Sequence, residues 1–215
     1  MEVSAMAAGI DTMSNTTSVA SQIKNAGYSF VARYYNTNNT SKNLTRAEAS
    51  ALSKAGLSIV AVWENGYPTT ASYFSYSKGL SDAQAAISYA RNTINQPGGT
   101  PIYFAVDYDA LDATVKGAVY EYFRGVNTAI INDGLNYWGG VYGSGAVCDY
   151  IVNHGENQDL QMITYSWLAQ STGWRGYSSF TGWNLKQGGA VTVAGLSCDT
   201  NTSSAAGGGG FKVTY

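Results

Sequence analysis

The stretch Pro101–Asp109 reads Pro-Ile-Tyr-Phe-Ala-Val-Asp-Tyr-Asp, so that an apolar and aromatic run leads into two aspartates. Its β-forming residues and the preceding Gly98-Gly99 turn predict a buried strand rather than a helix. Side chains two apart on a strand point the same way, so Asp107 and Asp109 are expected to share a face. Neighbouring carboxylates raise one another's pKa, which suits acid–base catalysis. The plainer alternative is that Asp109 or Asp112 caps a following helix.

Strands and helices alternate around this stretch along most of the chain. The pattern predicts strands over residues 7–11, 28–35, 57–63, 101–107, 136–142, 161–167, 182–187 and 190–198. It predicts helices over residues 15–26, 46–55, 82–94, 113–132 and 146–152, with Thr45 and Ser81 as N-caps. Gly188-Gly189 predicts a hairpin turn, and hence antiparallel pairing near the end of the chain.

This alternation favours an α/β fold of one domain over residues 1–215. We expect a modified TIM-type (β/α) barrel with about eight strands and five helices, the last strands being partly antiparallel. Its core is expected over residues 7–201. Residues 205–210 read as a flexible glycine-rich segment, and the chain then ends in a strand or a tail.

Acids and aromatics gather at the predicted strand ends, where barrels of this kind carry their active sites. The residues at these ends are Asp11, Arg33, Tyr35, Trp63, Glu64, Asp107, Asp109, Tyr142, Trp167, Gln170, Gln187 and Asp199. We expect the four aspartates Asp11, Asp107, Asp109 and Asp199 to converge in one pocket. Glu64 and Arg33 end neighbouring strands and are expected to line the same pocket.

The composition excludes some functions and favours others. Charged residues make up 12% of the chain, the net charge is −2, and there is no basic run, which argues against nucleic-acid binding. The 17 tyrosines, with tryptophan and asparagine, supply flat apolar area and hydrogen bonds of the kind that sugars need. No apolar run approaches the ~18 residues of a membrane span, and the first residues do not resemble a signal peptide.

The sequence indicates no metal site and no cofactor. Cys148 and Cys198 match no metal-ligand spacing, and whether they form a disulfide or stay free is open. His154 is the single histidine, and we interpret it as a surface residue at a helix C-terminus, where cations are favoured.

Several motifs in register resemble a known family. They are Gly9-Ile10-Asp11, Asp107-Tyr108-Asp109, Gly140-Val141-Tyr142-Gly143-Ser144, Trp167-Leu168-Ala169-Gln170 and Asp199-Thr200-Asn201. Their order is similar to that in family-25 glycoside hydrolases, the Chalaropsis-type lysozymes. Through Arg33-Tyr34-Tyr35, Trp63-Glu64 and Ile102–Asp109 the chain resembles more closely the bacterial glycoside-hydrolase-like domains related to them. The resemblance implies a modified barrel of eight strands and five helices that acts on cell-wall glycans.

The resemblance also implies catalytic roles. In the lysozymes the fourth strand ends in Asp-x-Glu, and that glutamate is the general acid; Asp109 stands there in this chain, with a side chain one methylene shorter. It implies Asp109 as the proton donor and Asp107 as its partner carboxylate. Asp11 and Asp199 would hold sugar hydroxyls or tune the pair, and Glu64 is a second candidate acid.

The substrate-binding candidates are the remaining residues of the rim. They are Asp199, Arg33, Tyr35, Trp63, Tyr142, Trp167, Gln170 and Gln187. Alternatively, Arg33 pairs with an acid in the barrel mouth, since a buried arginine needs a partner, and Tyr35, Trp63 and Trp167 pack in the core.

We therefore expect a secreted or cell-envelope glycosidase, monomeric and cofactor-free, that hydrolyses a peptidoglycan- or chitin-like glycan by carboxylate catalysis. Two alternatives are a non-catalytic glycan-binding module and a secreted structural or interaction protein built on the barrel. The sugar, the linkage and the stereochemical outcome stay open.

Overall fold

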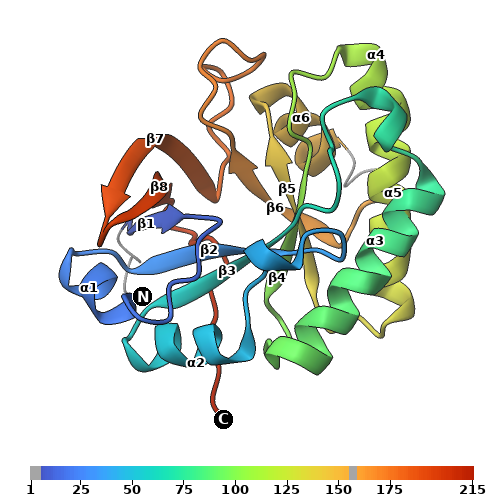
Figure 1. Ribbon diagram of the computed structural model, residues 1–215. Helices are drawn as coiled ribbons and strands as arrows, with labels where there is room; N and C mark the ends of the chain where they lie inside the picture. The colour runs from blue at the N-terminus through green and yellow to red at the C-terminus, as the bar shows by residue number, and fades with distance from the viewer. Residues whose placement is uncertain (1–5, 155–158) are drawn as a thin grey trace.

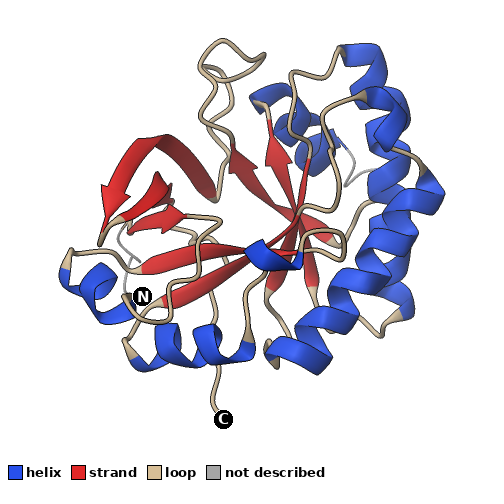
Figure 2. Cartoon of the chain, in the orientation of Figure 1, coloured by secondary structure: helices blue, strands red, loops and turns tan. Residues whose placement is uncertain are grey.

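A computed structural model describes residues 6–154 and 159–215, and within these residues the strands close into one barrel. The strands are β1 (Ala8–Asp11), β2 (Phe30–Tyr35), β3 (Ser58–Trp63), β4 (Pro101–Ala105), β5 (Trp138–Gly143), β6 (Ile163–Leu168), β7 (Leu185–Val193) and β8 (Leu196–Ser203). Neighbours from β1 to β7 are parallel, and β8 closes the barrel by pairing antiparallel with both β7 and β1. The modified TIM-type barrel with antiparallel last strands is thus confirmed (Figures 1 and 2).

Helices cover the outer face of the barrel, most heavily beside β4 and β5, where the longest two run side by side (Figure 1). They are α1 (Ala20–Asn25), α2 (Arg46–Lys54), α3 (Tyr76–Tyr89), α4 (Asp112–Thr114), α5 (Tyr120–Asn132) and α6 (Gly145–Asp149). Short π-helical segments continue α3 over Ala90–Ile94, join α4 to α5 over Val115–Val119, and continue α6 over Tyr150–His154.

The start of α3 differs from the prediction. Ser75, not Ser81, is its N-cap, because the Ser75 side chain accepts a hydrogen bond from the Lys78 N–H. The cap predicted at Thr45 is confirmed, since its hydroxyl oxygen accepts a bond from the Glu48 N–H.

Glycines allow α3 and α5 to pack very closely. A Cβ at Gly79 would lie 1.9 Å from the carbonyl oxygen of Tyr122, and one at Gly125 would lie 2.1 Å from that of Tyr76. Any larger residue at either position would therefore force the two helices apart.

Two apolar layers follow from the alternation of side chains along the strands. The barrel interior holds Phe30, Ala32, Val60, Val62, Tyr103, Ala105, Trp167 and Leu185. The residues between them in sequence, such as Val31 and Ile59, point outward into a larger core shared with the helices. Which rim residues can reach the barrel mouth is decided by this alternation.

The final hairpin turns at a different place from the one predicted. Val193 pairs with Leu196, so the turn is Ala194-Gly195, whose φ angles are +50° and +81°. Gly188-Gly189 lies inside β7, where the register with β8 shifts between Gln187 and Ala190. The two glycines therefore form a bulge in the strand and not the turn.

The glycine-rich segment near the C-terminus is packed, contrary to the expectation that it is flexible. The carbonyl of Gly208 accepts a 3.0 Å hydrogen bond from the Tyr103 hydroxyl, which rises from inside the barrel. Phe211 is buried and exchanges two backbone hydrogen bonds with Ile59 of β3. This segment therefore covers the barrel end opposite the strands' C-termini.

Both cysteines are buried and free, which resolves the alternative left open by the sequence. His154 closes the turn after α6, as expected for a helix end, and its side chain lies outside the described residues. Across residues 6–154 and 159–215, no helix has the length and apolar character needed to cross a membrane.

Candidate active site

A cavity of about 230 Å³ opens at the C-terminal ends of the strands, in the mouth of the barrel. Its lining includes eight of the residues that the sequence placed at the strand ends: Asp11, Glu64, Asp107, Tyr142, Trp167, Gln170, Gln187 and Asp199. Tyr34, Val62 and Ala105 complete the wall. Three of the four aspartates that we expected to converge do line the same cavity.

Asp11 ends β1 and is almost fully buried, at 4% exposure. Its Oδ2 accepts hydrogen bonds from Asn201 Nδ2 at 2.7 Å and from Gln187 Nε2 at 3.0 Å. Burial raises its pKa to about 6, against the lowering effect of these two bonds, and the nearby charges of Asp199 and Glu64 raise it further.

A chain of hydrogen bonds fixes the orientation of both amides beside Asp11. The Tyr142 hydroxyl donates to Gln187 Oε1 at 2.8 Å, so the amide nitrogen of Gln187 is the end that faces Asp11. Trp167 Nε1 donates to Asn201 Oδ1 at 2.8 Å and turns that amide in the same sense. The Tyr142 and Trp167 rings meet edge to face at 5.2 Å, which makes this wall rigid.

Asp107 follows β4 and lies partly buried in the opposite wall. Its backbone N–H donates to the carbonyl of Pro68 at 2.9 Å, which ties it to the loop after β3. Burial raises its pKa, the charge of Glu64 raises it further, and Lys42 acts in the opposite direction. Lys42 Nζ lies 3.1 Å from Glu64 Oε1 and 4.6 Å from the centre of the Tyr34 ring.

The carboxyl groups of Asp107 and Asp11 lie in different surroundings. Burial and the charge of Glu64 raise the pKa of Asp107, whereas Asp11 is more deeply buried, has a pKa raised to about 6 and accepts hydrogen bonds from two amides. Glycoside hydrolysis uses two carboxyl groups in one site, one as the acid and one as the carboxylate, and a raised pKa suits the acid.

Asp109 does not line the cavity. β4 ends at Ala105, so the strand alternation that would have put Asp109 on the face of Asp107 does not extend that far. Its Oδ1 instead accepts hydrogen bonds from the backbone N–H of Arg175 at 3.0 Å and from Arg175 Nε at 3.3 Å.

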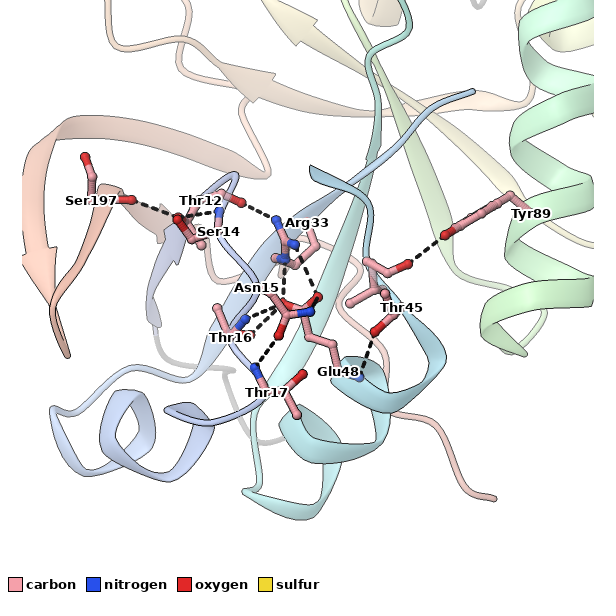
Figure 3. Close-up of polar contacts among 11 residues, drawn as sticks. Thr12, Ser14, Asn15, Thr16, Thr17, Arg33, Thr45, Glu48, Tyr89 and Ser197 are labelled. Atoms are coloured by element: carbon pink, nitrogen blue, oxygen red, sulfur yellow. Dashed lines mark hydrogen bonds and ion pairs between the residues drawn. The ribbon is translucent and has the colours of Figure 1, made fainter. Parts of the chain in front are cut away.

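Arg33 does not line the cavity either, because position 33 of β2 faces the helices. It is fully buried, and its Nε donates to Glu48 Oε1 at 2.7 Å (Figure 3). Its Nη1 donates to the carbonyl of Thr12, the residue after Asp11. Arg33 therefore pairs with an acid, but the expectation that this acid lies in the barrel mouth is wrong, because Glu48 lies on α2 and outside the cavity.

Tyr35 and Trp63 also lie in the outer core rather than in the cavity. The Tyr35 hydroxyl donates to Gln96 Oε1 at 2.8 Å, and Trp63 is 1% exposed. Both are one position away from a residue that does face the cavity, namely Tyr34 and Glu64. These aromatics therefore pack in the core, whereas Trp167 both packs and lines the wall.

Sequence reasoning missed four residues that shape this site. Tyr34 could have been found by extending the inward positions Phe30 and Ala32 along β2. Asn201 stands in a recognised motif but was not assigned to the site. Lys42 and Arg175 lie in connections between the main strands and helices, where the sequence has no hydrophobic periodicity from which a contact could be predicted. They reach the site region through Glu64 and Asp109 respectively.

Within the described residues, no group of three or more histidine, cysteine, aspartate or glutamate side chains is arranged to hold a metal ion.

Comparisons with known proteins agree with this architecture. The family model described as "Rv2525c-like, glycoside hydrolase-like domain" matches residues 21–203. The protein YbfG of Bacillus subtilis is 33% identical over 173 residues, which are 75% of this chain and 22% of YbfG. The chain spans about a quarter of the length of the curated relatives it matches.

Solved structures share the fold. The Tat-secreted protein Rv2525c of Mycobacterium tuberculosis, crystallised with HEPES, superposes with a TM-score of 0.79 at 22% identity, over 95% of this chain and 98% of that one. The bacterial lysozyme from Streptomyces coelicolor superposes with a TM-score of 0.57 at 16% identity, over 92% of this chain and 91% of that one. At these identities the likeness establishes the barrel fold.

Proposed function

The chain belongs to the Rv2525c-like, glycoside hydrolase-like domain family, and we propose that its rim cavity binds and hydrolyses an amino-sugar glycan of the cell wall. The observation that carries this proposal is the carboxyl arrangement in the cavity: Asp107 with a raised pKa beside Glu64, and Asp11 held as an acceptor by two amides. The lysozyme among the proteins of similar fold supports the choice of substrate class.

Asp107 is the proton donor in this proposal. A general acid must hold its proton near the working pH and must reach the glycosidic oxygen. Burial and the charge of Glu64 raise the pKa of Asp107, which is the direction that the first condition needs, and Asp107 lines the cavity, as the second condition needs. Glu64 is paired with Lys42, whose Nζ lies 3.1 Å from Glu64 Oε1.

Asp11 stabilises the positive charge that develops on the sugar ring in the transition state. Its Oδ2 is occupied by Gln187 and Asn201, and no described residue binds Oδ1. A fixed negative charge in a buried site acts more strongly than one in water. With a pKa of about 6, Asp11 is mostly ionised at neutral pH.

The cavity walls account for binding. At about 230 Å³, it is smaller than the ~300–1,000 Å³ of pockets that enclose whole drug-sized ligands, so it holds one ring of a polymer. Tyr34, Tyr142 and Trp167 supply apolar faces and Gln170 supplies an amide. Cell-wall glycan lies outside the cytoplasm, so we propose an extracellular or envelope location, which the Tat-secreted relative of the same fold supports.

The test is reducing-end release from peptidoglycan and from chitin oligomers, measured together with oligosaccharide binding by calorimetry. We expect the wild type to release reducing ends and Asp107→Asn to do so about 10²–10⁴ times more slowly, because a positioned acid contributes that factor. Asp107→Asn should still bind the oligosaccharide. Absence of both release and binding with every amino-sugar polymer would contradict the proposal.

A second candidate function is glycan binding without hydrolysis. It is favoured by Asp109, which stands where the lysozymes carry their acid and is engaged by Arg175 outside the cavity. Retained binding without reducing-end release by the wild type would select this candidate.

A further inference from the structure

We propose that Asp109 is a positioning residue, which with Arg175 clamps the segment that carries Asp107 against the connection between β6 and β7. We call Arg175, Asp109, Ala110 and Asp112 the Arg175 clamp. The inference that the clamp serves the glycan site rests on the proposed function, whereas the clamp itself stands on contacts alone.

Arg175 makes five contacts to three residues that follow β4, namely Asp109, Ala110 and Asp112. Its backbone N–H and its Nε donate to Asp109 Oδ1 at 3.0 and 3.3 Å. Its Nη2 donates to the carbonyls of Asp109, at 3.0 Å, and Ala110. Its Nη1 lies 3.4 Å from Asp112 Oδ1. Hydrogen bonds that involve ionised groups are the stronger kind, and a guanidinium fork engaged on both sides is well fixed.

The other side of the clamp is anchored just as firmly. The carbonyl of Arg175 accepts a 2.9 Å hydrogen bond from the N–H of Ala146 in α6. Gly176 packs backbone to backbone on α6, since a Cβ at Gly145 would lie 2.0 Å from the Gly176 carbonyl oxygen. Arg175 thus projects from a segment that is fixed to the barrel independently of Asp109.

Both clamped segments lead directly into the cavity. Asp107 lies two residues before Asp109 and is held on its other side by the Pro68 carbonyl. The connection that bears Arg175 includes Gln170, which lines the cavity and donates its N–H to Gln187 Oε1 at 3.3 Å. Gln187 in turn donates to Asp11. Loosening the clamp would therefore move Asp107 relative to Glu64 and Asp11.

The same contacts argue against Asp109 as the proton donor. Asp109 accepts hydrogen bonds from Arg175 through Oδ1 and does not line the cavity. The clamp requires only that the side chain at position 109 accept hydrogen bonds from Arg175. Asparagine offers the same Oδ1 acceptor without an acidic proton, whereas alanine offers none. The two substitutions consequently separate the two roles.

The experiment compares Asp109→Asn, Asp109→Ala, Arg175→Ala and the double alanine variant, with Arg124→Ala as a control for loss of a half-exposed arginine that is paired with Glu121. Hydrogen exchange of the ligand-free proteins is followed over residues 106–112 and 169–176. We expect exchange to accelerate about tenfold or more in both segments for each alanine variant, because hydrogen bonds to a charged group are lost. The double variant should show no further increase, and Asp109→Asn and Arg124→Ala should match the wild type.

A carboxyl NMR titration of Asp107 supplies a readout that general destabilisation would not move. Asp109→Asn and Asp109→Ala carry the same charge, so any difference between them reports the position of Asp107. We expect the lower Asp107 pKa in Asp109→Ala, where the segment loosens away from Glu64 and into solvent. With chitin oligomers, kcat should fall in Asp109→Ala and be retained in Asp109→Asn.

Two results would overturn the proposal. One is unchanged exchange in both segments of the alanine variants. The other is a loss of kcat of about 10²–10⁴ in Asp109→Asn with wild-type exchange, which would make Asp109 the acid. If the wild type neither hydrolyses nor binds any glycan, the proposed function fails, while the exchange and titration measurements still decide the clamp.

Discussion

Asp11 and Asp107 have the same intrinsic chemistry, and their surroundings separate them. Asp11 is held by two amide donors in a nearly closed site, whereas Asp107 lies beside the charge of Glu64 and keeps access to the cavity. The first arrangement fixes Asp11 as an acceptor, and the second raises the pKa of Asp107 while leaving its carboxyl group open to a substrate. Each yields a measurable dependence on pH.

Glu64→Gln should lower the pKa of Asp107, because one like charge is removed and Lys42, which already lowers that pKa, loses its partner. A general acid works only while it is protonated, so the basic limb of the pH–rate profile should move to lower pH. The profile is measured with chitin oligomers, and Glu121→Gln on the outside of α5 serves as the charge-matched control. A basic limb that stays in place would remove Asp107 as the acid.

Asp11→Asn should stabilise the protein at neutral pH but not at pH 4. The folded-state pKa of Asp11 is raised from 3.8 to about 6, so between these values the folded state binds more protons than the unfolded state. The stability of the wild type therefore falls as pH rises through this window, by on the order of 3 kcal/mol. Asparagine does not ionise, and its Oδ1 can still accept from Gln187 and Asn201.

The measurement is the free energy of unfolding by urea at pH 4 and pH 7 for both proteins. The advantage of the variant should grow between the two values. An advantage that is equal at both, or larger at pH 4, would show that burial does not raise this pKa.

At the scale of elements, the connection between β1 and α1 depends on a buried ion pair. Glu48 Oε1 accepts from Arg33 and also from the N–H and hydroxyl of Thr16, each at 2.8 Å (Figure 3). Arg33 reaches the carbonyl of Thr12 as well. These bonds hold residues 12–17 as a loop, which explains why α1 begins at Ala20 and not near residue 15.

Arg33→Leu should lower the free energy of unfolding by about 3–5 kcal/mol, because it leaves the carboxylate of Glu48 buried without its partner. Arg91→Leu is the matched control, since it breaks an exposed pair with Asp133 and should cost about 0–1 kcal/mol. Chemical unfolding of the two variants gives the comparison, and equal costs would contradict the structural role assigned to Arg33.

The sequence locates the strand ends, but it does not always predict whether a side chain there points into the barrel or toward the helices. Asp11, Glu64 and Tyr142 were found because apolar runs stop at or beside them. Arg33 and Tyr35 were assigned to the wrong face because both sides of β2 are buried and carry large side chains, so its pattern does not tell inward from outward. The loop residues Lys42 and Arg175 depend on tertiary contacts that leave no periodic signal.

At the scale of the whole molecule, the chain's last residues complete the barrel. The sequence suggested the closed α/β barrel through the alternation of strands and helices. It did not reveal that residues 207–213 cover one end, because glycine-rich composition is the same in a flexible linker and in a segment that must pass close to other backbone. A Cβ at Gly208, for instance, would lie 2.3 Å from the Leu185 side chain.

Phe211→Ala should therefore cost about 3–5 kcal/mol of unfolding free energy, as for other buried phenylalanines. The exposed neighbour Lys212 provides the control, and Lys212→Ala should stay within about 0.5 kcal/mol of the wild type. Thermal unfolding of both variants is the measurement. A small effect at Phe211 would mean that the segment adds little to the closed barrel.

The central proposal is that this barrel hydrolyses glycans with Asp107, and not Asp109, as its acid. The most direct test is the rate of reducing-end release from one chitin oligomer by the wild type, Asp107→Asn and Asp109→Asn under identical conditions. We expect a loss of about 10²–10⁴ in rate for Asp107→Asn and a rate close to that of the wild type for Asp109→Asn. The reverse order of the two variants, or equal rates for Asp107→Asn and the wild type, would contradict it.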